Sequence, residues 1–176
     1  QMNPHYLFNS LNLLTNLVYK DPDQSARFIQ KLAQVYRYVL DTHEKEIVPL
    51  SEELEFVQSF AYLQKMRFGE YLDVYINIQD DPNIFVLPLS IQMLVENAIK
   101  HNRISKDSPL TINIRLENDY IMVENELHPK EIIEDSKIGI GLENIRSRYQ
   151  FLSNKKVLVH VDDNNFIVQL PTLRES

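Results

Sequence analysis

A histidine in the first turn of a predicted helix is the first residue of this chain whose chemistry needs an explanation. The stretch NPHYLFNSLN, residues 3–12, puts His5 directly after an Asn-Pro pair. Three uses are open to such an imidazole: a solvated residue near a helix end, a metal ligand, or a nucleophile. A single histidine on a helix is most often the first of these. Metal ligation is disfavoured, because the predicted face around His5 offers only asparagines and no carboxylate.

A second group of polar residues lies on PLSIQMLVENAIKHN, residues 88–102. Asn97, Lys100 and His101 are spaced i, i+3 and i+4, so they share one flank of a helix. An amide oxygen can ligate Mg²⁺, and the two basic groups can meet phosphate oxygens. The same residues also fit a solvated polar face, since Lys and His favour the C-terminal end of a helix dipole. Spacing alone leaves both interpretations open.

Glycines give the third candidate. The chain has only three glycines, and two of them, Gly139 and Gly141, lie in KIGIGLENIRSRY just before a predicted helix. A glycine turn that leads into a helix presents backbone N–H groups and a positive dipole end to an anion. The alternative is an ordinary loop at the start of a helix.

The N-terminal part of the chain predicts two helices that would position the histidine. Asn3 and Pro4 are typical of a helix start, and residues 3–20 carry apolar residues at helical spacing. The apolar stripe consists of Leu7, Leu11, Leu14 and Val18, and the opposite stripe of His5, Asn9, Asn12 and Asn16. DPDQ, residues 21–24, starts a second helix that runs to about Leu40. Because this hairpin alone buries too little, we expect a homodimer through residues 1–45 that forms a four-helix bundle.

The rest of the chain predicts a sheet and its helices. Ser51 is expected to cap a third helix that runs to about Arg67, with Glu52 and Glu53 near its positive dipole end and Gly69 after its last turn. From residue 71 the apolar period changes to two, which predicts strands at 71–78, 110–116, 121–123, 157–161 and 166–170. Helices at about 88–101 and 141–152 interrupt this series. We therefore predict an α+β protein whose mixed, mostly antiparallel sheet carries helices on one face.

Composition excludes several classes of function. The net charge of −7 and the lack of a Lys/Arg block disfavour nucleic-acid binding. The absence of cysteine removes disulfides, thiolate nucleophiles and cysteine zinc sites, and fits a reducing compartment. No apolar run approaches the roughly 20 residues that span a bilayer. Since a motif begins almost at Gln1, we expect the chain to be a cytoplasmic piece of a longer protein, with any membrane anchor or sensor upstream.

The three stretches, in this order, closely resemble the LytS/YehU-type sensor histidine kinases. The resemblance covers nearly the whole chain and includes LSEELEFVQSFAYLQKMRF, residues 50–68, which is similar to that family's linker helix. It implies a histidine-bearing dimerisation hairpin, residues 1–46, followed by a GHKL (Bergerat-type) ATP-binding α/β sandwich, residues 47–176. It also implies autophosphorylation with ATP and Mg²⁺, and transfer of the phosphoryl group to an aspartate on a response-regulator receiver domain.

The resemblance gives each motif residue an expected role. His5 matches the phosphoacceptor, Asn97 matches the asparagine that binds Mg²⁺ between the phosphates, and Glu96 matches the acidic residue beside it. The remaining matches are basic neighbours of the nucleotide, Lys100 and His101, the glycine box, Gly139 and Gly141, and a lid over residues 126–138 from which Lys130 or Lys137 would reach phosphate. Asn9, one turn along from His5, is our candidate for orienting the imidazole ring.

One motif of the family is altered. Many such kinases carry D-x-G-x-G, whose aspartate binds the adenine amino group, whereas this chain has YIMVENELHPK at residues 120–130. Strand alternation puts Asn125 in the aspartate's place and Leu127 and His128 near the glycine positions. An alignment one residue earlier would use Glu124 instead and would turn an outward position inward. The neutral asparagine oxygen can still accept a hydrogen bond from adenine.

Two functions therefore remain open. One is an active autokinase, and the other is a degenerate kinase that acts as a dimeric signalling or docking module with weak or no ATP binding. A third, another GHKL ATPase or a serine kinase, is disfavoured because such proteins have no use for the NPHYLFN helix.

Overall fold

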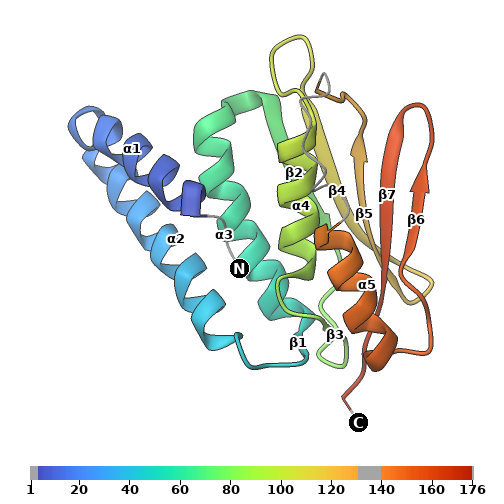
Figure 1. Ribbon diagram of the computed structural model, residues 1–176. Helices are drawn as coiled ribbons and strands as arrows, with labels where there is room; N and C mark the ends of the chain where they lie inside the picture. The colour runs from blue at the N-terminus through green and yellow to red at the C-terminus, as the bar shows by residue number, and fades with distance from the viewer. Residues whose placement is uncertain (1–3, 131–139, 176) are drawn as a thin grey trace.

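The computed structural model describes residues 4–130 and 140–175 (Figure 1). The elements are, in chain order, α1 (Pro4–Lys20), α2 (Pro22–Asp41), β1 (Val48–Pro49), α3 (Leu50–Phe68), the short 3₁₀ helix η1 (Gly69–Tyr71), β2 (Leu72–Asn77), β3 (Phe85–Val86), α4 (Ser90–His101), β4 (Leu110–Glu117), β5 (Tyr120–Glu126), α5 (Ile140–Leu152), β6 (Leu158–Val161) and β7 (Asn165–Pro171).

The two N-terminal helices form the predicted hairpin. The side chain of Asp21 caps α2 by accepting a hydrogen bond from the Gln24 amide, and Pro22 occupies the first helical position. The turn between the two helices is therefore short, and α1 and α2 run antiparallel to each other (Figure 1). The predicted domain boundary at residues 46/47 lies between α2 and β1, and it stays a prediction.

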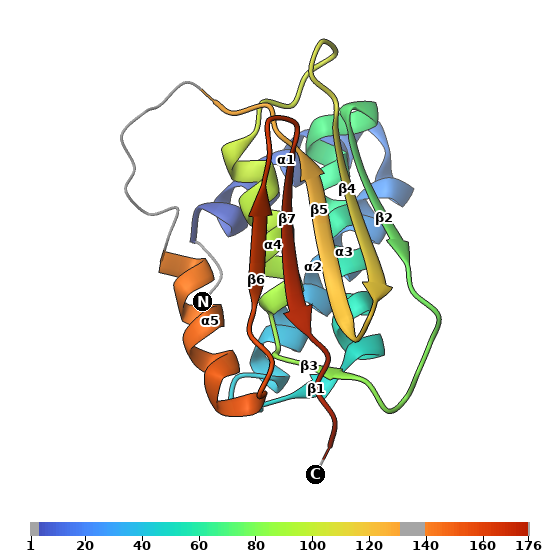
Figure 2. The ribbon, with the colours of Figure 1, turned by 90° about the vertical axis from the view of Figure 1, so that its right-hand side faces the viewer.

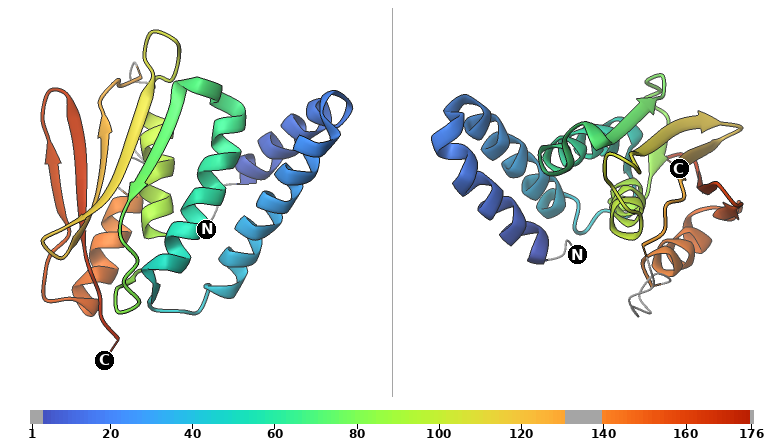
Figure 3. Two further views of the ribbon diagram at one scale, coloured as in Figure 1. Left: turned by 180° about the vertical axis from the view of Figure 1, so that it is seen from behind. Right: turned by 90° about the horizontal axis from the view of Figure 1, so that it is seen from above.

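The hairpin packs against α3 of the same chain, on the side away from the sheet (Figure 3). Phe28 and Val35 of α2 are buried at this contact. The rings of Tyr6 and Phe60 lie 5.5 Å apart, and those of Tyr38 and Phe56 stack at 4.3 Å. Such aromatic pairs add to the free energy gained from burying apolar area. One side of the hairpin is thus covered by α3, which the sequence did not predict.

A five-stranded sheet forms the other side of the molecule, in the order β2-β4-β5-β7-β6. β2 pairs with β4 in parallel, and every other pairing in this sheet is antiparallel. α3, α4 and α5 cover one face, whereas the other face carries none of the helices formed by residues 4–130 and 140–175 (Figure 2). Asn118 and Asp119 both have positive φ, as a tight hairpin turn between β4 and β5 requires. The predicted α+β class and the mixed, mostly antiparallel sheet are confirmed.

The start of α3 differs from the prediction. Ser51 makes no cap: Pro49 precedes the helix, and no side chain caps it. The reason is that β1 runs directly into α3, after pairing Val48 with Val86 of β3. These two strands are too short to produce a period-two pattern, so the sequence did not reveal them. The end of α3 is as predicted, since Gly69 has φ +62° and its N–H donates to the Lys65 carbonyl.

Candidate active site

His5 is exposed on the first turn of α1 and opens onto a pocket of about 310 Å³. The pocket is lined by residues of α1, α3 and α4 and by the segment after β5: His5, Tyr6, Asn9, Phe60, Gln64, Arg67, Phe68, Glu96, Ile99, Lys100 and Lys130. The predicted histidine and asparagine of α1 therefore share one cavity with Glu96 and Lys100 of α4. These residues lie far apart in the sequence, and the packing of the hairpin on α3 brings them together.

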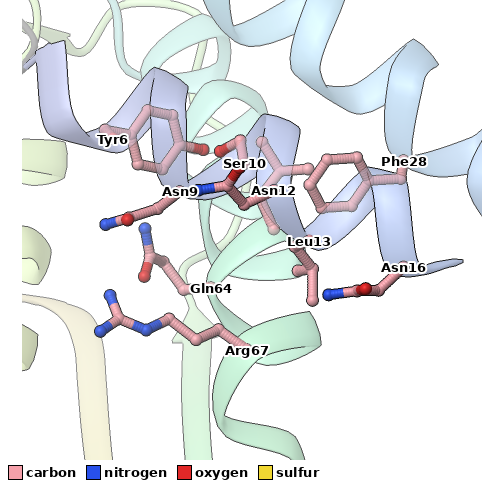
Figure 4. A pocket seen from close by; sticks show the side chains of 10 residues that line it. Tyr6, Asn9, Ser10, Asn12, Leu13, Asn16, Phe28, Gln64 and Arg67 are labelled. Atoms are coloured by element: carbon pink, nitrogen blue, oxygen red, sulfur yellow. The ribbon is translucent and has the colours of Figure 1, made fainter.

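The asparagine stripe of α1 also lines a cavity. Asn9, Asn12 and Asn16 border a second pocket, of about 290 Å³, between α1 and α3 (Figure 4). Gln64 and Arg67 of α3 line the opposite side of it, and both also border the pocket at His5. The polar seam predicted from the spacing on α1 therefore exists, and it faces α3.

Three of the four residues of the predicted apolar stripe on α1 are exposed, whereas the fourth, Leu14, is half-buried and packs against the core. Leu7, Leu11 and Val18 are 37%, 45% and 44% exposed, and Phe8 beside them is 64% exposed. Ile29 of α2 is also half exposed, at 51%. A helical hairpin that leaves several large apolar side chains in water has a surface suited to association.

Asn97 lies on α4 as the spacing predicted. The predicted buried stripe of this helix, Ile91, Leu94, Val95 and Ala98, is buried in full. Asn97 itself is half-buried, and Lys100 at the next turn is exposed. The amide side chain is therefore near the surface and is not enclosed in the core.

Gly141 of α5 lies directly against this part of α4. A Cβ atom added at Gly141 would be 2.9 Å from Met93 Sδ and 4.0 Å from Asn97 Nδ2. The absence of a side chain at position 141 thus lets the start of α5 approach Asn97, and two of the three sequence motifs meet here. Gly139 and Lys137, predicted for the same site, lie outside the described residues.

Asn125 faces inward on β5, as the strand alternation predicted. It is buried, and its Nδ2 donates a hydrogen bond of 2.7 Å to the Glu126 carbonyl. The side-chain NH₂ group is therefore occupied, while the amide oxygen keeps its accepting capacity. Glu124 faces the other side of the sheet, where its carboxylate accepts a hydrogen bond from Arg115 at 2.5 Å. Glu124 therefore occupies an outward position of β5, as the strand alternation predicted, and the assignment of Asn125 to the aspartate's place stays a prediction.

The first residues of the predicted lid are attached to the end of α4. The His128 amide donates to Asn102 Oδ1 at 2.7 Å, and the Arg103 amide donates to the His128 carbonyl at 2.8 Å. Lys130 follows, and its ammonium donates to the Lys100 carbonyl at 2.8 Å. These bonds bring Lys130 to the pocket at His5. Residues 131–138 of the predicted lid lie outside the described residues.

The basic groups at this end of α4 have perturbed pKa values. Burial, followed by the charges of Lys100 and Lys130, lowers the pKa of His101 below its usual value. His101 is therefore neutral at pH 7, and it offers a hydrogen bond where the sequence suggested a cation. Burial and the nearby charge of Arg67 also lower the pKa of Lys130.

Sequence reasoning missed Glu53, which joins the hairpin to α4. This fully buried glutamate accepts hydrogen bonds from the Tyr38 hydroxyl at 2.5 Å, the Leu89 amide at 3.1 Å and the Ile91 amide at 3.2 Å. It therefore caps the start of α4 from α3 and binds α2 at the same time. Burial raises its pKa to about 7. The sequence did contain a signal for this burial. Glu53 lies three, four and seven residues before Phe56, Val57 and Phe60, so it shares their apolar face of α3.

Arg67 and Gln64 of α3 were also missed, although both line the pocket at His5. Their positions depend on how α3 packs against the hairpin, which no local pattern reports. Across residues 4–130 and 140–175, no cluster of three or more His, Cys, Asp or Glu side chains is arranged to hold a metal ion.

Comparison with known proteins identifies the class. Residues 1–72 match the family model described as histidine kinase. Sensor histidine kinase BtsS of Escherichia coli is 30% identical over 172 residues, which cover 94% of this chain and 30% of that protein. Sensor protein LytS of Staphylococcus epidermidis is 28% identical over 151 residues, which cover 84% of this chain and 25% of that protein. The chain belongs to the histidine kinase family.

Within that family the chain is similar to the LytS and BtsS sensor kinases, as its three motifs predicted. It spans less than a third of the length of these relatives. Among solved structures, the catalytic domain of histidine kinase ThkA aligns with 73% of this chain and 97% of that one, at 16% identity and a TM-score of 0.49, and the assignment does not depend on it. None of the helices in the described part of the chain is long and apolar enough to cross a membrane.

Proposed function

We propose that the chain is the autokinase part of a two-component sensor: it transfers the γ-phosphoryl group of ATP to His5, and from there to an aspartate of a response-regulator receiver domain. The observation that carries this proposal is the pocket in which His5 and Asn9 of α1 meet Glu96 and Lys100 of α4. A phosphoacceptor must be reachable from the nucleotide site, and here the two helices border one cavity.

The nucleotide would bind along α4, at Asn97 and Gly141. Mg²⁺ is held mostly by substrate phosphates and water with one or two protein oxygens, so a single amide oxygen at Asn97 fits it. When bound there, Mg²⁺ supplies neutralisation of phosphate charge. Because position 141 has no side chain, the N-terminal end of α5 can lie close to Asn97 and face the bound phosphates. Lys100, Lys137 and Gly139 are proposed to contact the phosphates.

Asn125 is proposed to bind the adenine base. Its amide oxygen can accept a hydrogen bond from the adenine amino group, because its NH₂ group is held by the Glu126 carbonyl. His101 would assist as a neutral hydrogen-bonding group near the phosphates. The Lys130 ammonium, which is hydrogen-bonded to the Lys100 carbonyl, would place a positive charge in the pocket at the start of the lid.

The chemical step needs a neutral ring nitrogen on His5. Its lone pair attacks the γ-phosphorus, a P–N bond forms, and the bond from that phosphorus to the bridging oxygen breaks, so that ADP leaves with the electron pair. The proton on the other ring nitrogen is then lost. Glu96, half-buried in the same pocket, is our candidate to accept this proton, and Asn9 is our candidate to orient the ring. In the second step the P–N bond breaks, an aspartyl phosphate forms, and the histidine regains its proton.

We also propose that the chain works as a homodimer through residues 1–45. The support is the exposed apolar stripe of α1, Leu7, Leu11 and Val18, which α3 does not cover. Association through this stripe leaves the opposite seam, with His5 and the asparagines, directed toward α3 and α4.

Incubation with γ-labelled ATP and Mg²⁺ tests the proposed activity. We expect acid-labile label on the wild-type chain and none on His5→Ala or Asn97→Ala, with nucleotide binding lost only in Asn97→Ala. Asn113→Ala serves as the matched control, since Asn113 is an exposed asparagine on β4. A folded wild-type chain that takes up no label would instead favour the docking module.

A further inference from the structure

The pocket at His5 collects positive charge in a chain that is acidic as a whole. Arg67, Lys100 and Lys130 all line it, while the protein carries a net charge of −7. Glu96 is the one carboxylate among the described residues that line the pocket, and it accepts a hydrogen bond of 2.9 Å from Gln92. Among the described residues, none of the three cations forms an ion pair. Three cations with a single carboxylate among them leave an excess of positive charge, which favours the binding of a further anion.

Arg67 is the cation of this cluster to which the family resemblance gave no role. Its guanidinium lies 4.9 Å from the ring centroid of Phe68, which lines the same pocket. The positive charge of Arg67 contributes to lowering the pKa of Lys130. Figure 4 shows the polar ends of Arg67, Gln64 and Asn9 gathered on one side, and all three also line the pocket at His5.

We propose that Arg67 binds the phosphoryl group at His5, both as it is transferred and once it is attached to the ring. Guanidinium groups suit this task because their planar donors match phosphate oxygens in pairs. Gln64 and Asn9 add amide donors beside it, and Lys130 adds a second charge. The inference builds on the proposed autokinase function and assigns to α3, the helix between hairpin and sheet, a direct part in the reaction.

Inorganic phosphate tests the anion site without any kinase activity. The chain, with ¹³C-labelled histidine rings, is titrated with phosphate at constant ionic strength, and the His5 signal is identified by its absence in His5→Ala. We expect a saturable shift of the His5 signal, and an affinity that falls by about tenfold or more in Arg67→Gln, because hydrogen bonds to charged groups are among the strongest. A His5 signal that ignores phosphate, or that responds equally in Arg67→Gln, would overturn the proposal.

Lys65→Gln is the matched control. Lys65 lies on the same helix and the substitution removes the same charge, but its ammonium is paired with Asp73 at 2.6 Å, outside the pocket. We expect this variant to bind phosphate as the wild-type chain does.

The transfer rate gives the second readout. With γ-labelled ATP, Arg67→Gln should label His5 about tenfold to a hundredfold more slowly, Arg67→Lys should be intermediate, and Lys65→Gln should be normal. ADP affinity should stay within about twofold, because ADP lacks the phosphoryl group that Arg67 binds. Normal labelling of Arg67→Gln would overturn the role in transfer. If the wild-type chain binds phosphate through Arg67 but takes up no label, the proposed autokinase function fails and the anion site stands.

Discussion

The Glu53→Gln substitution tests whether burial or hydrogen bonding dominates the pKa of the Glu53 carboxyl. In the folded chain burial raises the pKa of Glu53 from 4.5 to about 7. The folded state therefore binds a proton more tightly than the unfolded state, and stability is lost as the pH rises from about 4.5 through 7. Since a change of one in pKa is worth about 1.4 kcal/mol, the loss due to this carboxyl is about 3 kcal/mol.

The comparison with Glu53→Gln isolates that loss, because glutamine does not titrate. Tyr38 and Tyr149 interact with the Glu53 charge, and the pKa values of both are raised above the ordinary tyrosine value, so neither titrates in this interval. We expect the free energy of unfolding of wild type minus that of Glu53→Gln to fall by about 3 kcal/mol between pH 4.5 and 7.5. Urea unfolding followed by circular dichroism measures it.

Glu55→Gln, an exposed glutamate on the same helix, is the control and should show no such trend. A difference between wild type and Glu53→Gln that is constant with pH would refute the reasoning. A difference that grows with pH would show that the hydrogen bonds from Tyr38, Leu89 and Ile91 outweigh burial and stabilise the ionised carboxylate.

Three further substitutions test the packing and the surface. Gly141→Ala should be less favourable by about 1 kcal/mol in the wild-type chain than in a Met93→Ala background, because the new Cβ would lie 2.9 Å from the Met93 sulfur; equal effects in both backgrounds in urea unfolding would contradict this. Gly69→Ala should lower the free energy of unfolding by about 1–3 kcal/mol through backbone strain alone, because φ is +62° and no atom lies within 4 Å of the added Cβ. An unchanged midpoint of urea unfolding would refute this prediction. Leu11→Glu should convert a dimer to a monomer in sedimentation equilibrium, and a wild-type chain that is already monomeric would exclude the proposed dimer.

Local patterns in the sequence predicted most of the elements of the fold. Features that depend only on neighbouring residues could be predicted from the sequence. They are the Asp21 cap, the end of α3 at Gly69 and the turn at Asn118 and Asp119. The buried stripe of α4 follows from helical spacing in the same way. The alternation on β5 was sufficient to turn Asn125 inward.

Features that depend on packing between distant segments were missed or wrong. Glu53 was predicted only to lie near the positive dipole end of α3, and its full burial was missed because its donors, Leu89 and Ile91, are 36 and 38 residues away in the sequence. Ser51 was wrong as a cap because pairing of β1 with β3 leads the chain straight into α3. Arg67 could not be found from local patterns, because only the packing of α3 against α1 and α4 places it in the pocket with His5.

The central claim is that the nucleotide site at Asn97 of a chain serves His5 of the same chain, through the pocket between α1 and α4. A mixed dimer tests it: wild-type chains are combined with longer, tagged Asn97→Ala chains, incubated with γ-labelled ATP, and separated by size. We predict label on the wild-type chain and none on the tagged chain, whose His5 is intact. Label on the tagged chain would contradict the claim, because its histidine would then have been phosphorylated from the site of its partner.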